Sequence, residues 1–261
     1  MPILLSGDFH ANSESELKSI RENTLMGQYS PELYKGINYH IILGDGGFLW
    51  PGNKNGDRAN YRELALRPFQ VLCVLGNHDP VLGRPDLPEI DIGIGEKVIL
   101  VNKERPFVAY LKRGKIYSIE GKKFLALGGA LSIDREYRLP NISWWENEYW
   151  TEAEKESVFL LLEKENRFDY VLSHTGPSRI NETVFAFLRQ SHLPKFFDEV
   201  GALNERIDGK ISCRQWFCGH WHRDEYHYDR IMQRGYRYLY RKTAVLTDDG
   251  IIDSDGHLYL S

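Results

Sequence analysis

Hydrophobic residues gather in short continuous runs along the chain, and each run stops at a glycine or a polar residue. Six segments of this kind are PILLSGD (2–8), YHIILGDGG (39–47), FQVLCVLGNHD (69–79), FLALGGA (124–130), DYVLSHTG (169–176) and RQWFCGHWH (214–222). Such runs predict buried strands, and their lack of alternation is typical of sheets that are covered on both faces. We therefore expect the main strands to lie in the interior of the protein.

Helical patterns lie between these strands. One helix is expected after the capping box of Ser13 and Glu16, and another after the capping box of Thr151 and Glu154. A third helix, or a pair of helices interrupted near a proline, is expected within residues 181–203. Strands that alternate with helices in this way predict an α/β protein.

Shorter alternating segments fill residues 98–130 and the C-terminal part of the chain, and they predict antiparallel strands and hairpins. In one of them Tyr236, Tyr238 and Tyr240 fall on one face and arginines on the other. This pattern favours a half-buried edge strand over a nucleic-acid-binding surface. Without an internal repeat or a proline-rich linker, residues 1–261 are expected to form a single domain with a mixed sheet system.

Composition narrows the classes of partner. Thirty-three lysines and arginines against 37 aspartates and glutamates give a formal net charge of -4, which excludes indiscriminate binding of polyanions and leaves nucleic acid only as a locally held substrate. The first residues lack a basic segment and a long apolar run, and the three cysteines are few and odd in number. We therefore expect a cytoplasmic protein with no membrane association and no obligate protein partner.

Side chains that commonly bind metals recur where the predicted strands end. They are Asp8, His10, Asp45, Asn77, His78, His174, His220 and His222. Loops at the carboxyl ends of strands converge on one side of an α/β sheet, so these residues can share a pocket. Because residues two apart in a strand face the same way, Asp8 with His10, and His220 with His222, are each expected to point into one cavity.

Carboxylate and amide oxygens mixed with imidazole nitrogens, without thiolates, favour manganese, iron or zinc over a cysteine-rich structural zinc site. A carboxylate such as Asp45 can bridge two cations. Two metals about 3.5–4 Å apart acidify a bridging water and stabilise both the attacking and the leaving oxygen of a phosphoryl displacement. These residue types therefore indicate hydrolysis of a phosphate ester.

The motifs GDFH (7–10), GDGG (44–47), GNHD (76–79), SH (173–174) and GHWH (219–222) resemble, in order and spacing, the five motifs of the calcineurin-like metallophosphoesterases. The resemblance implies a four-layer α-β-β-α sandwich in which two mixed β-sheets are flanked by helices and carry a dinuclear centre. It implies one metal held by Asp8, His10 and His222, a second held by Asn77, His174 and His220, and a bridge formed by Asp45. His78 would face the substrate phosphate, and would stabilise the transition state or protonate the departing oxygen.

The second motif departs from one branch of this superfamily. Phosphoprotein phosphatases continue it as Gly-Asp-x-Val-Asp-Arg-Gly, which supplies a carboxylate for the catalytic histidine and an arginine for the phosphate. Here Phe48 and Leu49 stand at those two places. The departure disfavours a serine/threonine protein phosphatase and leaves His78 without a predicted orienting partner.

Residues 127–150 form a second candidate region, similar to a segment of small bacterial and phage-borne metallophosphoesterases. Arg135 or Arg138 can clamp a phosphate by bidentate hydrogen bonds, and Trp144 or Trp145 can stack on a base. The alternatives are a salt-bridged surface loop for the arginines and core packing for the tryptophans, which we favour for the latter.

We thus expect a phosphoesterase with two divalent metals, manganese before iron or zinc, in which a metal-bridging hydroxide attacks phosphorus. The missing pair at Phe48 and Leu49 and the aromatic loop favour a phosphodiester of a nucleotide or nucleic acid. The alternatives are a phosphomonoesterase or protein phosphatase, and a non-catalytic metal-binding scaffold of the same fold. The complete set of ligand types argues against the scaffold.

Overall fold

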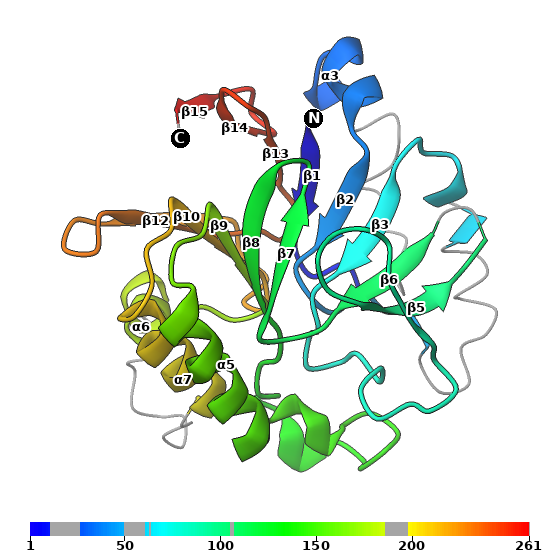
Figure 1. The fold of residues 1–261 in the computed structure, drawn as a ribbon, viewed down its shortest axis with the longest axis vertical. Coiled ribbons are helices and arrows are strands. Elements are labelled where there is room, and N and C mark those ends of the chain that lie inside the picture. Colours follow the sequence, from blue (N-terminus) through cyan, green and yellow to red (C-terminus); the bar gives the residue numbers. More distant parts are fainter. Residues whose placement is uncertain (11–26, 50–60, 63, 105–106, 186–197, 261) are drawn as a thin grey trace.

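Two β-sheets form the centre of the computed structural model, which describes residues 1–10, 27–49, 61–62, 64–104, 107–185 and 198–260 (Figure 1). Within these residues the larger sheet has nine strands, in the order β15 (Leu258–Leu260), β14 (Gly250–Asp253), β13 (Thr243–Leu246), β1 (Ile3–Ser6), β2 (Tyr39–Ile42), β3 (Gln70–Cys73), β6 (Val108–Leu111), β5 (Val98–Asn102) and β4 (Glu89–Ile90). The smaller sheet has six, in the order β11 (Glu225–Asp229), β12 (Arg234–Tyr238), β10 (Gln215–Cys218), β9 (Tyr170–Ser173), β8 (Lys122–Leu127) and β7 (Lys115–Ile119).

Each sheet has parallel strands at its centre and antiparallel strands at its edges. Strands β1, β2, β3 and β6 are parallel in the first sheet, as are β12, β10, β9 and β8 in the second. Antiparallel pairs flank both groups, among them β5 with β6 and β7 with β8. Both sheets are therefore mixed, as the sequence predicted, and the parallel strands send the loops at their carboxyl ends to a common edge.

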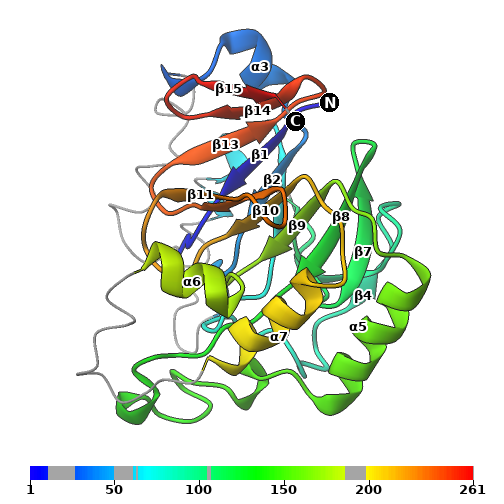
Figure 2. The same ribbon diagram turned by 90° about the vertical axis from the view of Figure 1, so that its left-hand side faces the viewer.

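Hydrophobic packing divides the molecule into four layers. Leu5 and Leu72 of the larger sheet belong to the same buried cluster as Phe124 and Phe217 of the smaller one, which is the core between the sheets. Helices α5 (Glu152–Lys164), α6 (Ser178–Val184) and α7 (Glu199–Asp208) lie along the outer face of the smaller sheet (Figure 2). Helix α3 (Pro31–Gly36) packs on the other side, where Tyr34 joins a buried cluster with residues of β1 and β13. The expected four-layer sandwich is confirmed.

The local helix signals are confirmed where the structure describes them. Thr151 caps α5, with its hydroxyl accepting from the Glu154 backbone and the Glu154 carboxylate accepting from the Thr151 backbone. Residues 181–203, where one helix or a pair was expected, contain the end of α6 and the beginning of α7. The helix expected after Ser13, and the interruption near Pro194, lie outside the described residues. None of the described helices combines the length and the apolar character needed to cross a bilayer.

The tyrosine-rich strand differs from its prediction. Strand β12 is an inner strand, because β11 pairs with it on one side and β10 on the other, and Tyr236 and Tyr238 are fully buried. Arg234, on the tyrosine face, pairs with Asp208 at 2.7 Å. On the other face, where the pattern predicted solvent, Arg237 is also buried and lies 4.0 Å from the buried carboxylate of Asp253, which lessens the cost of burying its charge.

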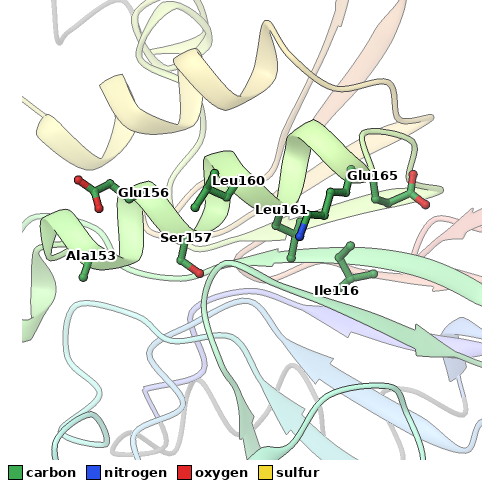
Figure 3. Close-up of a pocket in the computed structure, with 8 residues that line it drawn as sticks. Ile116, Ala153, Glu156, Ser157, Leu160, Leu161 and Glu165 are labelled. Atoms are coloured by element: carbon green, nitrogen blue, oxygen red, sulfur yellow. The ribbon is translucent and has the colours of Figure 1, made fainter.

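A shallow groove runs along the surface between α5 and β7 (Figure 3). It is lined by Ile116, Ala153, Glu156, Ser157, Leu160, Leu161, Lys164 and Glu165. None of the metal-binding residue types singled out at the strand ends lines this groove. The candidate chemistry therefore lies elsewhere, at the carboxyl edge of the parallel strands.

A buried histidine makes the stability of the fold depend on pH. His40, on β2, is fully buried, with its Nε2 2.7 Å from Ser6 Oγ. Burial, with a contribution from the Arg67 charge, lowers the pKa of His40 to about 3. Its folded pKa is thus below the unfolded value of about 6.5. The unfolded state binds the proton first as the pH falls, so stability is full above pH ~6.5 and declines toward pH ~3.

We therefore expect His40→Gln to flatten the acid limb of the stability profile. Between pH ~6 and ~4 the wild type should lose about 1.4 kcal/mol per pH unit more than the variant, which corresponds to one proton. Urea unfolding at pH 7, 6, 5 and 4, with EDTA present throughout to remove metal effects, measures the difference. Equal slopes for the two proteins would show that His40 does not carry this dependence.

Candidate metal centre

The loops after five parallel strands meet at one edge of the molecule and bring the strand-end residues together. Asp8 and His10 follow β1, Asp45 follows β2, Asn77 and His78 follow β3, His174 follows β9, and His220 and His222 follow β10. Asp8, Asp45, Asn77 and His174 are buried, whereas His10 and His222 reach the surface. The cluster thus has a buried floor and an open side.

The first group consists of Asp8, His10 and His222, whose ligand atoms lie within 4.8 Å of one another. The Nε2 atoms of His10 and His222 are 3.0 Å apart, and Asp8 Oδ2 is 4.0 Å from His222 Nε2. One carboxylate oxygen and two imidazole nitrogens at this spacing can hold a divalent cation.

The second group surrounds His174. Its Nε2 lies 3.0 Å from Asn77 Oδ1 and 3.3 Å from Asp45 Oδ2, and its ring centre is 5.0 Å from that of His220. His174 Nδ1 is 2.7 Å from the carbonyl oxygen of Leu43. A carbonyl only accepts, so Nδ1 carries a proton, which aims Nε2 into the cluster.

Asp45 lies between the two groups. Its Oδ2 is 3.6 Å from His10 Nε2 of the first group and 3.3 Å from His174 Nε2 of the second. Its Oδ1 accepts a hydrogen bond of 2.8 Å from the backbone N–H of His78. The carboxylate is therefore fixed in a position from which it can contact both groups.

Left-handed backbone, and not strand geometry, aims these side chains. Strands β1 and β10 end at Ser6 and Cys218, so the paired residues two apart lie in loops. Positive φ angles occur at Asp8 (26°), His10 (41°), Asp45 (50°), His220 (69°) and His222 (50°). The residues do converge, as expected, but through loop conformation and not through the alternation of strand side chains. Such conformations are unfavourable for residues with a Cβ and tend to occur at functional sites.

Two glycines allow the loops to approach this closely. A Cβ on Gly44, whose φ is 92°, would lie 2.1 Å from His174 Nδ1. A Cβ on Gly76 would lie 2.0 Å from Asp45 Oδ1. Both positions therefore need glycine if His174 and Asp45 are to keep their places.

The electrostatics of the cluster fit a cation. Neither oxygen of Asp8 accepts a hydrogen bond of normal geometry from the described residues, and burial raises the pKa of Asp8 to about 8. Burial alone would lower the pKa of His174, but the charges of Asp45 and Asp8 outweigh it and raise that pKa to about 10. Carboxylates that draw a proton so strongly would also attract divalent cations, and the oxygen and imidazole donors suit them.

His78 contacts a different loop. Its Nδ1 is 3.3 Å from Arg138 Nη1, and Arg138 is held by Asp134, whose Oδ1 accepts from Nε at 2.6 Å. Burial lowers the pKa of His78 to about 4, with the charge of Arg138 acting in the same direction. At the place of the missing motif residues, Phe48 is fully buried in a hydrophobic cluster.

The other candidates in residues 127–150 lie further along the loop. Arg135 stacks on Trp144, with its guanidinium carbon 4.2 Å from the ring centre, and donates to the Tyr149 hydroxyl at 2.7 Å. Trp144 and Trp145 are half-buried rather than part of the core, where Trp150 packs instead. Among the described residues no contact joins Arg135 to the metal-ligand types, whereas Arg138 reaches His78.

Sequence reasoning missed three supporting residues. Asp79 accepts hydrogen bonds from the Gly76 backbone at 2.7 Å and from Tyr110 at 2.8 Å, and its place in the GNHD motif was an available signal. Ser132 lies 3.0 Å from Asn77 Nδ2 and 2.7 Å from Glu148. Nothing in the local pattern marks Ser132 or Glu148, because each is more than 50 residues from Asn77.

Comparisons with known proteins bear on the family and on the fold. The sequence model of the family described as calcineurin-like phosphoesterase matches residues 1–224. The structure resembles that of a dimetal phosphatase from Danio rerio, with 11% identity, a TM-score of 0.51, and coverage of 97% of this chain and 95% of that one. This likeness concerns the fold.

A putative 5'-nucleotidase from Staphylococcus aureus, in complex with alpha-ketoglutarate, is 14% identical with a TM-score of 0.49. The match covers 100% of this chain but 52% of the nucleotidase, so the chain spans about half of its length. No curated protein matches the sequence significantly.

We expect Gly76→Ala to abolish most of the stabilisation by manganese, because the new methyl group displaces Asp45. Wild type should gain about 2.7 kcal/mol at a metal concentration 100 times the Kd. Melting curves with MnCl2 and with EDTA measure this gain. Gly27→Ala is the matched control, since a Cβ there meets no atom within 4 Å. If Gly76→Ala folds in EDTA and gains as much as the control, the close packing is not required for metal binding.

Proposed function

Because the chain belongs to the calcineurin-like phosphoesterase family, we propose that the strand-end cluster is the active site of a dinuclear metal-dependent phosphoesterase. The observation that carries the proposal is the position of Asp45. Its Oδ2 lies within 3.6 Å of a histidine nitrogen from each of the two groups. A bridging ligand needs this position, and a lone structural metal would not.

In this proposal the two groups hold separate cations. Asp8, His10 and His222 would hold one, Asn77, His174 and His220 would hold the other, and Asp45 would contact both. Manganese is the first candidate, with iron or zinc as alternatives, because the donors are oxygens and imidazole nitrogens. When bound, two such cations supply an acidified water as nucleophile and neutralise charge on the phosphate.

His78 is proposed as the catalytic residue that faces the phosphate. Its Nδ1 lies 3.3 Å from Arg138 Nη1 and its Nε2 lies 3.1 Å from Asn77 Nδ2, so the ring is held between two donor groups beside the proposed metal ligands. In the proposed role the imidazole stabilises the phosphate oxygens or passes a proton to the leaving oxygen. Arg138 thus takes the orienting role for which the second motif offers no residue.

Arg138 is also the stronger candidate for substrate binding. Its Nε and Nη1 donate to Asp134, Ser143 and His78, and among the described residues none accepts from Nη2. This edge of the guanidinium can contact a phosphate oxygen. Arg135, held against Trp144, is proposed to contact a more distant part of the substrate.

We propose a phosphodiester of a nucleotide or nucleic acid as the substrate. Tyr137, next to Arg138, is 88% exposed, and the half-buried Trp144 lies in the same loop. Exposed aromatic rings beside a phosphate site can stack on bases. The three cysteines are buried free thiols, which supports the proposal of a reducing, cytoplasmic compartment.

We expect Asp45→Asn and His78→Ala both to lose activity, but for different reasons. His78→Ala should lower kcat/KM by about 10²–10⁴-fold, the range for loss of a general acid, while still binding two manganese ions per chain. Asp45→Asn should also lose metal, since an uncharged amide is a poor bridge. Metal content by elemental analysis, beside hydrolysis of bis(p-nitrophenyl) phosphate, measures both effects.

The same measurements test the bridging role of Asp45 separately from the wider proposal of a metal-dependent phosphoesterase. Full activity of Asp45→Asn protein, freed of wild-type enzyme, would refute the bridging role. A wild type that binds less than one transition metal per chain and stays inactive after manganese reconstitution would favour a non-catalytic scaffold.

Substrate preference is tested with a pair of chromogenic esters. We expect bis(p-nitrophenyl) phosphate to be hydrolysed faster than p-nitrophenyl phosphate in the presence of manganese, because one guanidinium edge of Arg138 suits one negative charge better than two. The measurement is kcat/KM for both esters at one pH and one metal concentration. Faster turnover of the monoester would contradict the phosphodiester proposal and favour a phosphomonoesterase.

A further inference from the structure

Asn77 differs from the other proposed ligands because the two ends of its side-chain amide are not equivalent. Its oxygen can bind a cation, whereas its NH2 group cannot. A rotation of the amide by half a turn would therefore remove a ligand without changing the shape of the site. Asn77 is 3% exposed, so solvent does not decide between the two orientations.

Asn77 Nδ2 lies 3.1 Å from His78 Nε2, but an imidazole nitrogen can donate or accept, so this contact fits either orientation. Contacts from a distant loop decide between the two. Asn77 Nδ2 lies 3.0 Å from Ser132 Oγ, and this hydroxyl donates to Glu148 Oε1 at 2.7 Å. A serine hydroxyl has one hydrogen, so when it is used on Glu148 only lone pairs face Asn77. The nearest group of Asn77 must then be its NH2, which turns Oδ1 toward His174 Nε2, 3.0 Å away.

The hydrogen bond from the Ser132 hydroxyl to Glu148 is fixed by the surroundings of Glu148. It is 2% exposed, and its second oxygen accepts from the Ser132 backbone N–H at 3.0 Å. Ser132 therefore presents two hydrogens, one from its backbone and one from its side chain, to the two oxygens of a single buried carboxylate. Both donors are required because a buried carboxylate without hydrogen bonds is costly.

From these contacts we infer that Ser132 and Glu148 are positioning residues that hold the Asn77 amide with its oxygen toward the metal centre. The inference rests on the proposed function, because it takes Asn77 as a metal ligand. Neither residue contacts the reacting atoms. Their effect on catalysis passes through one ligand of the second group, and it should be visible in metal affinity before any substrate is added.

The test is a double-mutant cycle on manganese affinity. Ser132→Ala should weaken binding at one of the two sites by about 10–100-fold, the range for loss of a group that orients a ligand. In an Asn77→Asp background the two oxygens are equivalent and orientation no longer matters, so adding Ser132→Ala should change affinity by less than about 3-fold. Titration of free Mn²⁺ by electron paramagnetic resonance gives the number of sites and their Kd.

Two further variants separate positioning from packing. Glu148→Gln can accept from only one of the two Ser132 donors, so it should weaken the same site, whereas Ser132→Thr keeps the hydroxyl and should restore affinity. Ser143→Ala is the matched control: its hydroxyl accepts from the Leu139 backbone in the same loop at 3.0 Å, and its side chain is not hydrogen-bonded to any proposed ligand. The control should leave both sites intact.

The outcomes distinguish this inference from the proposed function. If wild type binds two manganese ions and Ser132→Ala binds them with the same Kd, the positioning role is wrong while the phosphoesterase proposal stands. An equal loss in both backgrounds would also overturn it, since the effect would then be structural. A wild type that binds no manganese would contradict the proposed function itself.

Discussion

Burial of negative charge is the constraint on which the rest of the structure depends. The carboxylates of Asp8 and Asp45 are each about 2% exposed and lie in the same cluster. Removing ionised carboxylates from water costs several kcal/mol each unless opposite charge or hydrogen bonds compensate. Around them lie imidazoles and one amide, which are side-chain types that commonly bind metals. The burial of both acids among these groups therefore suits a site for divalent cations.

The fold meets this constraint by placing the cluster at the edge of two stacked sheets. The parallel strands deliver five loops to one place, where Asp8, Asp45 and His174 are buried. Left-handed backbone at Asp45 and His220 and the missing Cβ of Gly44 and Gly76 then bring the side chains into contact. These local conformations are unfavourable on their own, so the packed sheets must hold them in place.

The loop of residues 127–150 supplies what the motifs at the strand ends lack. Ser132 contacts Asn77, and Arg138 contacts His78, so one segment reaches both residues that follow β3. Where the phosphoprotein phosphatases have a carboxylate and an arginine, this chain has Phe48 packed into a hydrophobic cluster. The groups that contact Asn77 and His78 come instead from residues 55 and 60 positions beyond them in the chain. The same motifs at the strand ends can therefore be supported by different neighbouring side chains.

The sequence by itself determined the strands, the capped helix α5, the layered fold class and the identity of the eight strand-end residues. The strands and the helix follow from local apolar runs and a capping box, the eight residues follow from short motifs, and the layered fold class follows from the family resemblance that those motifs carry. Only the tertiary structure decided that β12 is an inner strand, that Asp45 lies between the two groups, and that Arg138 rather than a motif residue contacts His78. The physical reason is sequence separation: hydrophobic periodicity reports how one segment is buried, whereas the partner of a buried charge or amide is chosen by the packing of segments that are far apart in the chain.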